Sequence, residues 1–191
     1  NRYALHAMAD LEMRRANHGG AAEALETLLS QLSGDKQIEV ARQLAQLYEG
    51  PLDDGENALR VLEIVHRGDP TDFDAIARLQ RLAEKKEDWP RVTTLLAKLI
   101  EVEGDEEEAS EMTRQLALIY ADKMDKGDHA LAVLERLADQ GDAACQHAYV
   151  ARGIALGWKG IVATKLVAWN ESVVGSSRAD ARRQAFQLFV E

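Results

Sequence analysis

Apolar residues recur along this chain at intervals of three and four positions, the spacing of an amphipathic α-helix. Leu5, Met8 and Leu11 begin the pattern, and no alternating β pattern lasts longer than a few residues. Glycine, proline or a polar cluster interrupts the pattern at short intervals. It predicts some eleven short helices, over about 2–16, 21–32, 37–49, 56–67, 72–86, 90–102, 106–122, 128–139, 143–156, 160–170 and 177–190.

The predicted helix ends depend on residues that break or cap a helix. We expect a break at His18-Gly19-Gly20, because glycine loses much backbone entropy inside a helix. Gly50-Pro51 predicts a stop, because proline has no amide hydrogen and clashes with the preceding turn. Either Thr71 or Asp72 can cap the helix that follows. Pro90 falls near a helix start, where its missing donor costs nothing.

One stretch of the chain occurs twice. Residues 55–63 (GENALRVLE) return as 127–135 (GDHALAVLE), an offset of 72 residues or two steps of 36. A period of roughly 20–50 residues is typical of solenoids and other repeat arrays. Isolated helices of this length are marginal in water, so each must bury its apolar stripe on a neighbour. The sequence therefore predicts an all-α fold of antiparallel helix pairs, stacked in chain order.

Two sets of residues keep the same order along the chain: Leu44-Ala45, Tyr48, Ala58, Leu62 and Pro70, and then Leu116-Ala117, Tyr120, Ala130 and Leu134. This order resembles the tetratricopeptide repeat (TPR) family, whose unit of about 34 residues is a helix-turn-helix. Each set has one residue inserted in the loop. The resemblance implies an α-α superhelix in which the alanines let paired helices approach closely.

We expect residues 1–191 to form a single TPR-like array. Its repeats fall near 2–35, 38–72, 73–106 and 110–144, followed by a degenerate repeat at 145–175 and a trailing helix at 177–190. Gly153 stands in the degenerate repeat where an aromatic residue belongs. The trailing helix either caps the stack or begins another repeat. Because the chain starts at Asn1 rather than at methionine, we expect it to be a piece of a longer protein.

The charge of the chain disfavours nucleic acid and anionic membrane as partners, because phosphate binding needs clustered cations. The formal net charge is −10, and it is uneven: residues 145–191 carry +3 and residues 1–144 carry −13. The chain is then either a solvated acidic body with a mildly basic end, or part of a head-to-tail electrostatic contact. No stretch is apolar enough to span a bilayer. The single cysteine, Cys145, fits a reducing compartment, so the expected location is cytoplasmic.

No arrangement of residues typical of a catalytic, cofactor or metal site is found. The five histidines are scattered, and there is no HExxH, GxGxxG or GxxxxGK[ST] motif. We therefore predict a protein that is not an enzyme and needs no cofactor. The acidic run from Glu101 to Glu111 is either a solvated linker or a surface for a basic partner. Trp89, Trp158 and Trp169 either pack between helices or anchor a peptide.

The resemblance also implies which residues contact a ligand, since TPR proteins hold extended peptides or a partner helix on a concave face lined by first helices. Carrying those positions over gives His6 and Asp10, Arg42 and Gln46, Ala77 and Arg81, and Arg114 and Leu118. Arg42, Arg81 and Arg114 would form a basic ladder that prefers an acidic segment. The alternative is that these arginines pair along their own helices with Glu39, Glu84 and Glu111.

Two functions remain open from the sequence. The first is a scaffold for protein–protein interaction that binds an unidentified peptide or partner helix. The second is a structural spacer or self-association segment with no ligand of its own. A trailing helix at 177–190 with exposed Phe186 and Phe189 would favour the second function, through homo-oligomers formed by this helix.

Overall fold

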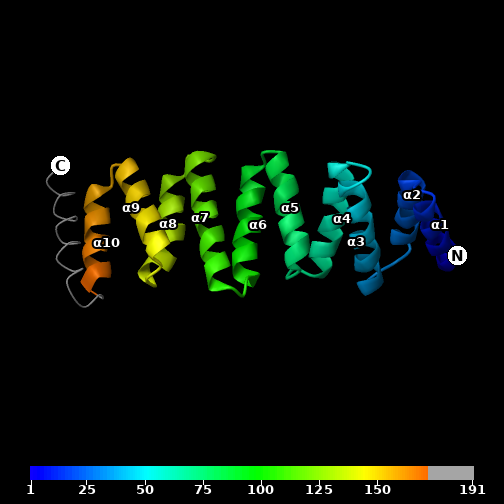
Figure 1. Cartoon of the computed structure of the whole chain (residues 1–191), viewed down its shortest axis with the longest axis horizontal. Helices are drawn as coiled ribbons and strands as arrows, with labels where there is room; N and C mark the ends of the chain where they lie inside the picture. The colour runs from blue at the N-terminus through cyan, green and yellow to red at the C-terminus, as the bar shows by residue number, and fades with distance from the viewer. Residues whose placement is uncertain (172–191) are drawn as a thin grey trace. The chain divides into compact units, whose positions relative to one another are not determined.

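The computed structural model describes residues 1–171, which form ten α-helices and no strand (Figure 1). The described residues belong to two compact units, divided between Val102 and Glu103, and each unit is described by itself. Unit 1 contains α1 (Arg2–Arg14), α2 (His18–Leu29), α3 (Asp35–Glu49), α4 (Gly55–Gly68), α5 (Phe73–Lys85) and α6 (Trp89–Val102). The described part of unit 2 contains α7 (Glu106–Asp122), α8 (Gly127–Asp139), α9 (Ala143–Ala155) and α10 (Lys159–Glu171).

Unit 1 is built from three antiparallel helix pairs, α1–α2, α3–α4 and α5–α6 (Figure 1). We call α1, α3 and α5 the first helices of these pairs. The pairs also pack on one another in chain order, α3 against α2 and α5 against α4. The interior consists of aliphatic side chains with almost no exposed surface, among them Leu28, Leu44, Val61, Leu62, Ile76, Leu79 and Val92. Each of these contributes about 1.5–3 kcal/mol by leaving water.

Small residues let the helices within a pair approach closely, as the sequence predicts. Ala45 on α3 and Ala58 on α4 have no exposed surface, and Ala130 on α8 is equally buried. The prediction of an all-α fold is confirmed. The single array over residues 1–191 and its repeat boundaries stay predictions.

The break between α1 and α2 differs from the sequence-based prediction. The structure places it at Ala16 and Asn17, and His18-Gly19-Gly20 form the first turn of α2. Asn17 caps this helix by accepting a hydrogen bond from the amide of Gly20 at 3.2 Å. First-turn amides have no partner within the helix, so a good cap there offsets the entropic cost of the glycines.

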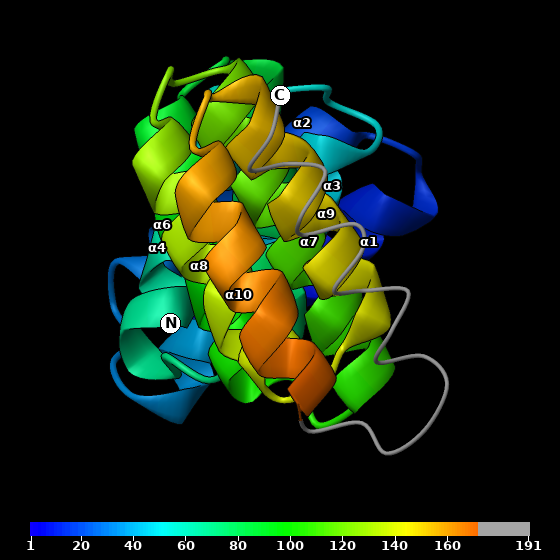
Figure 2. The same cartoon turned by 90° about the vertical axis from the view of Figure 1, so that its left-hand side faces the viewer.

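Unit 2 repeats this packing with α7 against α8 and α8 against α9, and α10 lies beside α9 (Figure 2). Gly153 on α9 lets α10 pack closely against α9, because a Cβ atom at this position would lie 2.3 Å from Cγ2 of Val162. The missing aromatic residue of the degenerate repeat is thus replaced by a direct helix contact. The predicted helix at 177–190, with Phe186 and Phe189, lies outside the described residues.

The tryptophans differ in their burial. Trp169 is buried edge-on against Tyr149, with 5.4 Å between the ring centroids, and its Nε1 donates to Asp139 at 2.6 Å. Trp89 is half-buried at the start of α6, whereas Trp158 is exposed. Packing between helices is therefore confirmed for Trp169, and Trp158 keeps a free surface.

Candidate functional site

The first helices of unit 1 carry three of the groove residues predicted from the sequence at one repeated position. Leu44 of α3 and Leu79 of α5 are both buried and mark equivalent positions of the two helices. Two residues further along the chain stand Gln46 and Arg81, and the corresponding residue of α1 is Asp10. All three of these polar side chains are exposed.

A hollow of about 460 Å³ lies between α1, α2 and α3. We call it the α1–α3 hollow. Asp10, Met13, Gln43 and Gln46 line it together with His18, and its apolar lining is Ala9, Leu25, Leu47 and Pro51. Nδ1 of His18 is buried and has no hydrogen-bond partner among the described residues. The polar side chains that this hollow presents to solvent are the exposed Asp10, Gln43 and Gln46.

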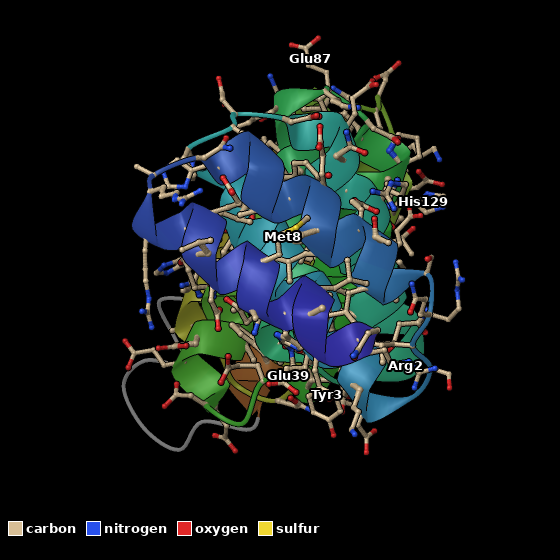
Figure 3. The ribbon with its side chains drawn as sticks, turned by 90° about the vertical axis from the view of Figure 1, so that its right-hand side faces the viewer. Arg2, Tyr3, Met8, Glu39, Glu87 and His129 are labelled. Atoms are coloured by element: carbon tan, nitrogen blue, oxygen red, sulfur yellow. The ribbon has the colours of Figure 1, made fainter. Side chains whose placement is uncertain are left out.

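A second hollow, of about 330 Å³, lies toward the N-terminal end of α1. His6 lines it with Tyr3, Lys36 and Glu39, over the apolar side chains of Leu28, Leu32 and Val40. Figure 3 shows Tyr3 and Glu39 on the same side of unit 1. Arg2 also lines this hollow, so two basic side chains, Arg2 and Lys36, stand against one acidic side chain, Glu39.

A third hollow, of about 340 Å³, separates the C-terminal ends of α3 and α5. We call it the α3–α5 hollow. Arg81 lines it with Lys85 and Lys86, and Tyr48 and Glu49 come from α3. The Tyr48 hydroxyl donates to Glu26 at 2.8 Å, and burial together with this hydrogen bond raises the pKa of Tyr48 to about 12. Tyr48 is therefore neutral at physiological pH, and the charge of this hollow comes from its other groups.

Arg42 does not pair with Glu39, which was the alternative considered from the sequence. Its Nη2 lies 2.5 Å from Oδ2 of Asp72, the residue that caps α5. The other carboxylate oxygen of Asp72 accepts from the amide of Ala75 at 3.0 Å. One carboxylate thus caps α5 and ties it to α3, so Arg42 already has a structural role.

In unit 2, Arg114 takes both the predicted partner and a further one. Its Nη2 lies 2.5 Å from Glu111, and its Nη1 donates to Oγ of Ser110 at 2.8 Å. Ser110 in turn donates to Asp142, which caps α9 through the amide of Cys145 at 2.8 Å. Although burial opposes it, the hydrogen bonds from Ser110 and Cys145 lower the pKa of Asp142. This network links α7 to the start of α9.

Cys145 is fully buried in this network, and burial raises the pKa of its thiol. A thiol that stays protonated in an apolar interior is a weak nucleophile. Cys145 is therefore a small residue of the core of unit 2. Among the described residues, no group of His, Cys, Asp and Glu side chains is placed to hold a metal ion.

Unit 2 has its own hollow of about 290 Å³, between α7 and α9. Arg114 and Leu118 line it on α7, and Ala148, Ala151, Arg152 and Ala155 line it on α9. Leu118 is exposed, and Arg152 donates to Asp122 at 2.9 Å. The hollow is thus apolar between two arginines that already have acidic partners.

Arg81 differs from the other two arginines of the predicted ladder. It forms no ion pair with Glu84, and none with any other residue in the part of the chain that the structure describes. Glu49 lines the same hollow as Arg81, but it accepts a hydrogen bond from Nε of Arg78 at 2.6 Å. The burial of Arg78 was not predicted, because a charged residue on the polar side of a helix normally faces water.

Within the described residues, none of the helices has the length and apolar character needed to cross a membrane. No family model matches the chain. No curated protein matches it either.

Solved structures do match it. MamA, a TPR protein, is 16% identical with a TM-score of 0.50, and the match covers 98% of this chain and 88% of MamA. The chain has a TPR-like fold. A tetratricopeptide repeat protein from Parabacteroides merdae is also similar, at 15% identity and a TM-score of 0.47, over 100% of this chain and 85% of the other. At these identities the likeness is one of fold.

The double role of Asp72 leads to a testable ranking of variants. Asp72→Ala removes the cap of α5 and should destabilise this helix by about 1 kcal/mol. Asp72→Asn keeps a capping oxygen and should cost much less. Arg42→Gln should change stability by less than about 1 kcal/mol, because the arginine is about half exposed and water screens the pair. Hydrogen exchange of the first turn of α5 measures all three variants. Equal losses in Asp72→Ala and Asp72→Asn would contradict the capping role.

Proposed function

We propose that the chain is a scaffold for protein–protein contact that holds an extended peptide or a partner helix along the exposed face of its first helices. The observation that supports this most is the α1–α3 hollow, which combines an apolar lining with Asp10 and Gln46, exposed side chains that have no ion pair among the described residues. A ligand side chain can bury apolar surface there while its polar end finds hydrogen-bond partners. Small-molecule and peptide sites commonly have this composition.

Part of the proposal concerns an acidic ligand segment. Arg81 is the arginine of the ladder that can receive a ligand carboxylate directly, since it has no acidic partner among the described residues. Arg42 and Arg114 would first have to exchange Asp72 and Glu111 for the ligand. We therefore place the acidic contact of unit 1 at Arg81.

Blocking the α1–α3 hollow tests the scaffold function. Peptides are selected from a displayed random library on the immobilised chain, and their affinities are measured by fluorescence anisotropy. Gln46→Trp fills the hollow from an exposed position and should weaken binding at least roughly tenfold, since it excludes the ligand side chain. Arg67→Trp, an exposed position near the end of α4, is the matched control and should bind like the wild type. Peptides that bind both variants equally well would place the contact elsewhere.

A second candidate function is self-association, and it is supported by the uncovered side of α1. Met8 and Leu11 are 49% and 45% exposed, whereas Leu44 and Leu47, at the equivalent positions of α3, are 0% and 5% exposed. In α3 these positions are covered by the preceding second helix, α2. Figure 3 looks at unit 1 from its α1 side and shows Met8 at the front of the view. A second copy of α1 could cover this apolar stripe.

Sedimentation over a range of concentrations tests this second candidate. The wild-type chain should form dimers as concentration rises, and Met8→Glu should abolish them, because a carboxylate cannot be buried unpaired in an apolar contact. Ala132→Glu, at an exposed position of α8, is the control and should leave the dimer intact. A chain that stays monomeric throughout would rule this function out.

A further inference from the structure

One position of the first helices carries a different charge in each repeat of unit 1. Asp10 on α1, Gln46 on α3 and Arg81 on α5 stand two residues after Met8, Leu44 and Leu79, which are equivalent in the three helices. All three side chains are exposed, and none takes part in an ion pair with another described residue. At this one repeated position the side chain therefore changes from acidic through neutral to basic along the unit.

The acidic end of this series lies in the α1–α3 hollow. Among the residues that line this hollow, Asp10 alone is an acidic residue, and no lysine or arginine lines it. Met13 and Leu47 offer an apolar surface suited to the aliphatic stem of lysine or arginine. The side-chain amide oxygen of Gln46 can accept a further hydrogen bond from an N–H group. A basic ligand side chain satisfies all of these groups at once.

The basic end of the series lies in the α3–α5 hollow. Of its charged groups, Glu49 is engaged by Arg78, and Lys86 lies 3.3 Å from Glu56 outside the hollow. Arg81 and Lys85 then outweigh the remaining acid, Asp53. An arginine fork binds a carboxylate with two parallel hydrogen bonds, so an acidic ligand side chain suits this end.

We infer that unit 1 recognises a bipolar peptide, whose basic side chain docks at Asp10 and whose acidic side chain docks at Arg81. This inference rests on the proposed scaffold function and adds the charge order of the ligand to it. A peptide with the same charge at both ends meets a like charge at one of the two hollows. Such a juxtaposition costs affinity, so the order of charges selects the partner.

The test uses displayed random peptides selected separately on the wild-type chain, Asp10→Lys, Arg81→Glu and the double variant. Peptides from the wild type should carry both a basic and an acidic residue, separated by a spacer. Asp10→Lys should select acidic peptides, and Arg81→Glu should select basic ones. The double variant again has opposite charges at the two positions, so it should return to bipolar peptides. Each single reversal should weaken the wild-type peptides at least roughly tenfold by fluorescence anisotropy.

Two charge reversals outside the hollows serve as matched controls, Glu23→Lys on α2 and Arg67→Glu on α4. Both positions are exposed, and both variants should select the same peptides as the wild type. Peptides that lose affinity with Gln46→Trp but show no charge pattern would overturn the inference and leave the scaffold function standing. Failure to enrich any peptide on the wild-type chain would overturn both.

Discussion

The fold depends on the burial of apolar side chains between helices that are adjacent in the sequence. Leu44 shows how this works: it has no exposed surface, because α3 packs on both α2 and α4. Alanines such as Ala45 and Ala58 bring the paired helices close enough for these side chains to meet. Helices of this length would be marginal alone, so the packing between neighbours supplies the stability that the individual segments lack.

This mode of packing decides which polar groups remain available. Charged residues join neighbouring helix pairs, as Arg42 of α3 does with Asp72 at the start of α5, and as Arg91 of α6 does with Glu63 of α4 at 2.5 Å. The first helices use Arg42 and Arg78 in this way, whereas Asp10 and Arg81 have no ion partners among the described residues. The candidate binding surface is therefore what remains after the fold has used the other charges.

The sequence predicted the fold more fully than the site. The spacing of apolar residues and the positions of helix-breaking and capping residues located all ten described helices, because both are local signals. The start of α2 was placed too late, because the cap at Asn17 outweighs the cost of Gly19 and Gly20. His6, Asp10, Gln46, Arg81 and Leu118 each line one of four separate hollows, and their assignment to a ligand groove stays a prediction.

The partners of the arginines could not be derived in the same way. Arg42 and Asp72 are thirty residues apart, and their contact depends on how one helix pair stacks on the next. The burial of Arg78 depends on the same stacking. The spacing of residues along one helix contains no information on such contacts. The alternative in which Arg42 pairs with Glu39 on its own helix used this spacing alone, and it was wrong. The hollow-lining residues Met13, His18 and Gln43 were missed for the same reason.

Hydrogen exchange across the whole chain after Leu44→Ala tests most directly whether neighbouring helices stabilise one another. Such a substitution in a packed interior costs about 2–5 kcal/mol. If packing passes from neighbour to neighbour, protection should fall most in α2, α3 and α4 and least in α8 and α9. Equal loss of protection in all of these helices would contradict the account, because it would mean that the chain unfolds as one globule.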